Sequence, residues 1–90
     1  MQSNILNIEN WNSYKDEVCT HYTYKINDNY IYNMWINNIN VICNDDMYSL
    51  VVCDITENNY DNIIELICLD KELDYCLNIA KENYKIYNTI

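Results

Sequence analysis

Apolar and polar residues alternate along the middle of this chain in short runs, which cover residues 22–26, 30–36, 39–43 and 47–55. A period of two sends successive side chains to opposite faces of a strand, so the first three runs predict strands with one apolar face. The last run is apolar on both faces and predicts the most buried strand. Clusters of Asn and Asp separate the runs and tolerate turn conformations, so these short connections predict an antiparallel meander.

The flanks of this predicted sheet show a helical period instead. Apolar residues recur at spacings of three and four over residues 7–19, which predicts a short amphipathic helix. After the last strand the same spacing continues over residues 57–86, and Thr56 or Asn58 is suited to cap a helix there. The pattern fits one long helix or two helices, the second beginning at Asp70.

These elements predict an α+β fold with a short N-terminal helix and a four-stranded antiparallel β-meander. A C-terminal helix or helix pair packs on one face of the sheet. Ninety residues suit one compact acidic domain over residues 1–90. Half of the residues are apolar, which favours a folded core over disorder.

Composition adds a signal that the pattern does not contain. The chain has 17 Asn, 14 Ile and 10 Tyr but no Gly, Pro, Arg or Phe, which indicates an A+T-rich gene of a low-GC genome. Lys codons are as A+T-rich as those of Asn, yet five Lys stand against 14 acidic residues, for a net charge of −9. We therefore interpret the charge as selected. The choice of Tyr over Phe likewise favours surfaces that are partly wet and partly contacted.

The acidic residues are concentrated in one part of the chain. Residues 45–74 carry nine of them against Lys71 alone. The nine are Asp45, Asp46, Asp54, Glu57, Asp61, Glu65, Asp70, Glu72 and Asp74. In the predicted helix, Asp61, Glu65 and Glu72 would share one face. Carboxylates in such a row imitate the phosphates of a nucleic acid, whose binding is dominated by charge. The alternative is a solvated face that keeps the protein in solution.

In general character the chain resembles the small, acidic, glycine-poor anti-CRISPR and DNA-mimic proteins of phages and mobile elements. The resemblance is one of composition, covers no alignable motif and carries over no residue. It implies an inhibitor or decoy that occupies the nucleic-acid-binding surface of a larger basic protein, such as a CRISPR effector or nuclease. Direct binding to nucleic acid is disfavoured, because there is no Arg and only five Lys.

A second hypothesis is a toxin-immunity protein or an adaptor. In that case Tyr24, Tyr30, Tyr32 and Trp35, expected on the outer sheet face, would anchor the partner and the carboxylates would steer association. Edge strands without proline leave homodimerisation open, so the chain is expected to be a monomer or a homodimer.

No catalytic motif is evident. The absence of Gly removes phosphate-binding loops and dinucleotide fingerprints, and a domain this small has little room for a lined pocket, so we expect no enzyme and no cofactor. Cys19 and His21 would share a strand face and could form a nucleophile pair, but a structural histidine is the simpler interpretation. The five cysteines contain no CxxC pair, which predicts reduced thiols, neither a metal site nor a disulfide framework. An intermolecular disulfide stays open.

The expected location is the cytoplasm of the host cell. No window of 18 apolar residues exists, so no segment is expected to cross a membrane. The first residues lack the basic and apolar regions of a secretory signal.

Overall fold

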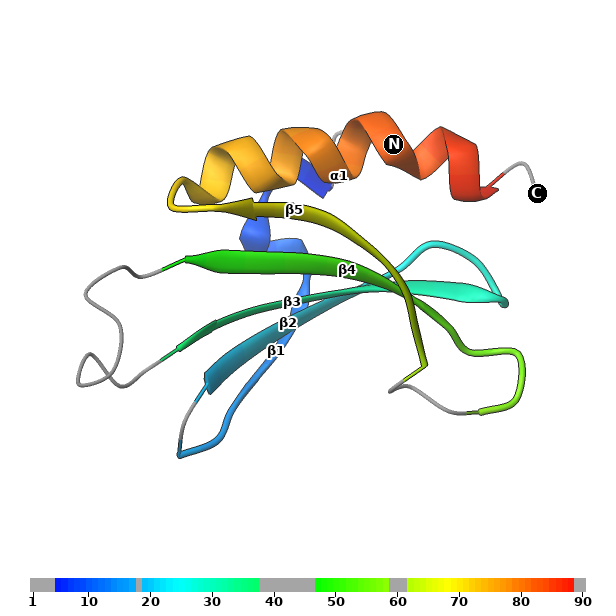
Figure 1. The fold of residues 1–90 in the computed structure, drawn as a ribbon, viewed down its shortest axis with the longest axis horizontal. Coiled ribbons are helices and arrows are strands. Elements are labelled where there is room, and N and C mark those ends of the chain that lie inside the picture. Colours follow the sequence, from blue (N-terminus) through cyan, green and yellow to red (C-terminus); the bar gives the residue numbers. More distant parts are fainter. Residues whose placement is uncertain (1–4, 18, 38–46, 59–61, 89–90) are drawn as a thin grey trace.

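The computed structural model describes residues 5–17, 19–37, 47–58 and 62–88 (Figure 1). Its elements in chain order are a 3-10 helix η2 (Ile8–Asn10), strands β1 (Asn12–Lys15), β2 (Cys19–Lys25), β3 (Tyr30–Asn37), β4 (Tyr48–Asp54) and β5 (Ile63–Asp70), and helix α1 (Leu73–Asn88). The strands form one sheet in the order β1-β2-β3-β4-β5. Every neighbouring pair is antiparallel. The α+β class and the antiparallel meander are therefore confirmed.

Three of the four predicted strands have counterparts in β2, β3 and β4. The predicted strand over residues 39–43 lies outside the described residues. The structure instead contains two strands where helices were predicted, β1 and β5, so the described sheet has five strands and not four. The helical part of the predicted 57–86 segment is the single helix α1.

The prediction of a helix over residues 7–19 is wrong, because the backbone becomes extended at Trp11 after the single 3-10 turn η2. The Asn7 side chain accepts a hydrogen bond from the Glu9 backbone N–H, as Asn does at helix starts and turns. Trp11 is then buried, and its Nε1 donates to the Ile5 carbonyl at 2.9 Å. This anchor turns the chain into β1, which pairs with β2.

The prediction of a helix over β5 fails because two irregularities hide the strand period. In the pairing with β4, the register skips Ile67 between Cys68 and Leu66, and skips Ile64 between Glu65 and Ile63. Each extra residue is a bulge, which shifts the in–out alternation by one position. Apolar residues then recur at intervals of three and four, as in a helix, although the β-branched isoleucines favour a strand.

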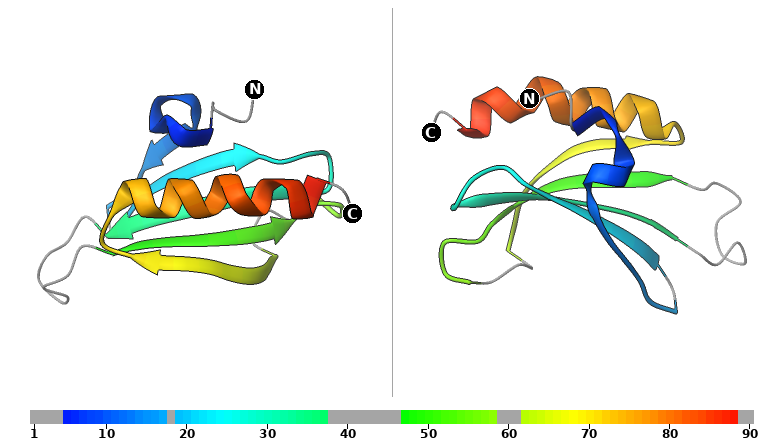
Figure 2. Two further views of the ribbon diagram at one scale, coloured as in Figure 1. Left: turned by 90° about the horizontal axis from the view of Figure 1, so that it is seen from above. Right: turned by 180° about the vertical axis from the view of Figure 1, so that it is seen from behind.

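Helix α1 covers one face of the sheet, and the N-terminal segment lies on the same side (Figure 2). Cys76, Leu77 and Ala80 of α1 are buried in the same core cluster as Tyr32 and Leu50 of the sheet. The other members of this cluster are Ile5, Trp11, Ile26, Met34, Val52, Cys68 and Tyr87. The Tyr32 hydroxyl donates to the Ala80 carbonyl at 2.6 Å, and burial raises the pKa of Tyr32 well above its usual value. The core thus lies between α1 and one face of the sheet.

Candidate binding face of the sheet

The second face of the sheet, which we call the open face, is not covered by α1 (Figures 1 and 2). Residues opposite each other in an antiparallel pair point to the same side, so the strand register assigns its members. Three rows cross the sheet from β5 towards β2: Leu69, Ser49, Trp35 and His21; Leu66, Val51, Asn33 and Thr23; and Ile63, Cys53, Ile31 and Lys25. Tyr14 and Asn12 of β1 extend the first and second rows.

The two sides of the open face differ in chemistry. Around β5 it is apolar, and we call this side the apolar half, formed by Ile31, Trp35, Val51, Cys53, Ile63, Leu66 and Leu69. Val51 and Cys53 are buried, whereas Ile63, Leu66 and Leu69 are 52%, 57% and 53% exposed. Large aliphatic side chains half open to water along an edge strand are a recognised sign of a contact surface or an aggregation risk.

Carboxylates lie near both ends of β5. At the β4 end are Asp54 and Glu57, and at the α1 end are Asp70, Glu72 and Asp74. The register places Asp54 opposite Tyr30 and Asp70 opposite Tyr48, so these two lie on the face that α1 covers. The Asp54 carboxylate accepts hydrogen bonds from the Thr56 hydroxyl and backbone N–H, which lower its pKa below the usual value. Six of the nine residues in the predicted acidic cluster are described, and only one lysine interrupts this part of the chain.

The helical row of carboxylates is a wrong prediction. Glu65 lies on β5, where it points to the face covered by α1 and accepts a hydrogen bond from the Tyr87 hydroxyl. Glu72 precedes α1, and its backbone N–H donates to the Asp70 side chain at 2.8 Å. Asp61, like Asp45 and Asp46, lies outside the described residues. The acidic cluster therefore borders a strand and does not form one helical face.

The expectation that four aromatic residues share the outer face is also wrong. Tyr24, Tyr30 and Tyr32 belong to the face that α1 covers, and Tyr32 is fully buried. The ring of Tyr24 packs edge-on against Tyr84 of α1, at 6.3 Å between ring centroids. Trp35 alone of the four lies on the open face, since strand alternation separates it from its even-numbered neighbours.

The side of the open face around β1 and β2 is polar. It contains a hollow of about 560 Å³ lined in part by Asn12, Tyr14, Thr23, Ile31 and Asn33. This mixed lining offers hydrogen-bonding groups to a ligand.

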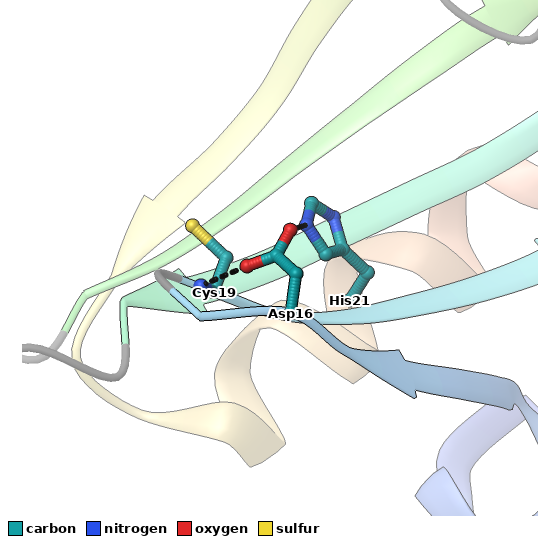
Figure 3. A group of neighbouring side chains, drawn as sticks. All are labelled: Asp16, Cys19 and His21. Carbon is teal, nitrogen blue, oxygen red and sulfur yellow. Dashed lines mark hydrogen bonds and ion pairs between the residues drawn. The ribbon is translucent and has the colours of Figure 1, made fainter.

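Beside the hollow, the turn between β1 and β2 gathers Asp16, Cys19 and His21 (Figure 3). Asp16 Oδ1 accepts from the Cys19 backbone N–H at 2.6 Å, and Oδ2 lies 3.1 Å from His21 Nε2. The His21 ring stacks on Tyr14 with centroids 4.5 Å apart and planes 7° from parallel. The sequence prediction noticed Cys19 and His21 but missed Asp16, which the turn places next to both.

A different pair of thiols lies in the core. Cys68 Sγ of β5 and Cys76 Sγ of α1 are 3.3 Å apart. Burial, together with the hydrogen bond to Cys68, raises the pKa of the Cys76 thiol to about 12. Both thiols are buried, and together with Cys19 and Cys53 they are the free cysteines among the described residues.

Comparison with protein-family models, with curated proteins and with solved structures found no match to this chain. In the part of the chain that the structure describes, α1 is too short and too polar to cross a bilayer. The open face and its surroundings are therefore the features of the molecule that bear on its function.

Proposed function

We propose that this protein is a small inhibitor or decoy that binds a basic, nucleic-acid-binding surface of a larger protein through the apolar half of its open face. The observation that carries the proposal is the set of three half-exposed aliphatic residues on β5, with exposed carboxylates near both ends of the strand. The proposed place of action is the cytoplasm of a host cell. The proposed origin in a phage or mobile element depends on composition alone.

The apolar half supplies the contact area. Fold stability does not require Ile63, Leu66 and Leu69 to be apolar, because each remains about half exposed and none belongs to the core cluster. Trp35 lies across Ser49 from Leu69 and adds a large ring of the kind that dominates binding energies. The two bulges disturb the backbone of β5, so we propose that the partner is held by side chains and not by an added strand.

The carboxylates specify the chemistry of the partner. An apolar centre with a charged rim is the usual plan of a transient interface. A rim of negative charge fits a partner whose own apolar patch lies among Lys and Arg, as in a groove that binds nucleic acid. The charge would accelerate association and reject acidic partners, while the aliphatic residues slow dissociation.

The first experiment is affinity capture of proteins from a nuclease-treated low-GC bacterial lysate that contains CRISPR effectors and nucleases. Bound proteins are eluted with a salt gradient and identified by mass spectrometry. We expect a basic nucleic-acid-binding protein that is released by moderate salt and displaced by its own DNA or RNA.

Two matched variants assign the surface. Leu66→Lys with Leu69→Lys places two charges in the apolar half, and Tyr75→Lys with Ile86→Lys makes the same charge change at exposed positions of α1. The first variant should lose the captured partner and the second should retain it. Retention by both variants would contradict the proposed surface.

The toxin-immunity or adaptor hypothesis makes a different prediction. Of its four proposed anchors only Trp35 is on the open face, so it would depend on the same apolar half with little help from charge. A partner that neither salt nor nucleic acid displaces, but that Trp35→Ala releases, would favour this alternative.

A further inference from the structure

We propose that Asp16, Cys19 and His21 form a binding site for a zinc ion at the turn between β1 and β2. This inference is independent of the proposed function and concerns the polar side of the open face. One oxygen, one sulfur and one nitrogen atom from these side chains all lie within 4.8 Å of one another.

The turn brings the three donors together. The Asp16 backbone N–H donates to the Cys19 carbonyl at 2.9 Å, and the Cys19 N–H donates back to Asp16 Oδ1. Cys19 and His21 are two residues apart on β2, so their side chains point to the same face. Stacking on Tyr14 holds the imidazole over the open face next to the Asp16 carboxylate.

The separations suit a metal after a small adjustment. Zinc bonds of about 2.0–2.3 Å in a tetrahedral site place neighbouring ligand atoms roughly 3.3–3.8 Å apart. The three ligand atoms lie within 4.8 Å of one another, so side-chain rotations that move them about one ångström closer together reach the distances of a zinc site. Asp16 is exposed and Cys19 is half-buried at this end of the sheet. His21 Nδ1 is buried and has no hydrogen-bond partner among the described residues, so one ring nitrogen is not engaged by the protein. In the metal-bound form the contact of Asp16 with His21 Nε2 would give way to bonds to the ion.

The donor set favours zinc over other common ions. Calcium and magnesium take oxygen ligands, whereas zinc accepts thiolate, imidazole and carboxylate together. Three protein ligands leave one tetrahedral position for water. A net charge of −9 adds a general attraction for cations.

A Cys–His nucleophile explains the geometry less well. Figure 3 shows the Asp16 carboxylate between the thiol and the ring, where it contacts His21 Nε2 at 3.1 Å. A general base must instead present a nitrogen to the thiol. A carboxylate that reaches both neighbours is better placed to share a cation with them.

The test is titration of the reduced protein with zinc against a chromophoric chelator, together with nuclear magnetic resonance of the histidine ring. His21 is the only histidine, so its ring signals report the site directly. We expect one zinc ion per chain and a shift of these signals with zinc but not with magnesium. Cobalt should give a thiolate charge-transfer band.

Variants distinguish zinc binding at these three side chains from a general attraction of zinc to the negatively charged protein. Cys19→Ser and Asp16→Asn should each weaken zinc binding by at least about 10-fold, since even outer-shell losses reach that size. Glu17→Gln removes the same charge from the adjacent exposed residue and should leave the affinity unchanged. Circular dichroism of the metal-free variants verifies that they fold.

Three results would overturn the inference: no zinc binding at micromolar concentration, zinc binding without a change in the His21 signals, or equal affinity in Cys19→Ser. The last result would point to the Cys68 and Cys76 thiols instead.

Discussion

The two edges of the sheet differ in length, composition and regularity. The β1 edge has four residues, all exposed, and its sequence is Asn-Ser-Tyr-Lys. The β5 edge has eight residues, two bulges and three half-exposed aliphatic side chains on the open face. A short polar strand with a lysine is an ordinary way to protect an edge from aggregation. On β5 the bulges disfavour the addition of another strand to the backbone, but the aliphatic side chains remain exposed. This combination is expected where a partner contacts the side chains only.

The aliphatic residues of β5 should contribute less to the free energy of unfolding than the core residues do. Leu50→Ala, at a fully buried position beneath α1, should lower the free energy of unfolding by about 2–5 kcal/mol. Leu66→Ala, at a 57% exposed position, should lower it by less than about 1 kcal/mol. Urea denaturation measures both. A large cost at Leu66 would mean that the apolar half serves the fold and not a partner.

Prediction two compares the edges in binding. Leu66→Lys with Leu69→Lys should weaken the captured partner by about 100-fold, or ~2.7 kcal/mol, because both side chains lie in the proposed contact. Asn12→Lys with Tyr14→Lys places two charges on the β1 edge and should change affinity by less than about 3-fold. Biolayer interferometry with the purified partner measures both affinities. Equal losses of affinity at the two edges would contradict the proposal that the partner binds only at the β5 edge.

Prediction three tests the rim of carboxylates. The variant Glu57→Gln with Glu72→Gln and Asp74→Asn removes three charges from this rim. Its association rate at low ionic strength should be about 10-fold lower, and the rate should depend less steeply on salt concentration. The matched control neutralises Glu9, Glu17 and Glu82, which are exposed elsewhere. An unchanged salt dependence in the first variant would leave the acidic cluster as a solubility feature.

The alkaline pH dependence of the free energy of unfolding should report on the face covered by α1. Burial raises the pKa of Cys76 from 9.0 to about 12 and also raises the pKa of Tyr24 and Tyr32. The unfolded chain therefore loses these protons at lower pH than the folded protein does. Stability should be constant with respect to these groups below pH 9 and should fall as the pH rises towards 12.

Thermal unfolding across this range measures the effect. Leu66→Asn should keep the same alkaline slope as the unmodified chain, because residue 66 lies on the open face, the titrating groups lie on the face that α1 covers, and Asn does not titrate. A slope that changes with Leu66 would connect the two faces and weaken the distinction between core and contact surface.

The central strands were predictable because each obeys a clean local rule. Alternation along β3 separates Tyr32 and Met34 from Trp35, and the apolar run of β4 marks the most buried strand. The edges were not predictable in this way, because bulges in β5 mimic a helical period and the chain becomes extended at Trp11, inside the predicted first helix. The run of β-branched residues at Ile63 and Ile64 was the available signal for a strand.

The candidate sites depended on these edges, so they were only partly predictable. Composition predicts the acidic cluster, and six of its nine members are described around β5, but the spacing of the aliphatic residues among them predicts the core face of a helix. The contact of Asp16 with His21 arises from a hairpin that replaced a predicted helix. Neither feature can be read from spacing until the strand register is known.

The most direct test of the proposed contact surface is photocrosslinking in bacterial cells, with a photoreactive benzoylphenylalanine in place of Leu66, of Tyr14 or of Tyr75. The proposal predicts a crosslink to a larger basic protein from position 66 and none from position 14 on β1 or position 75 on α1. Crosslinks to such a protein from position 14 or 75 alone, or a crosslink from position 66 only to a second copy of this chain, would contradict it.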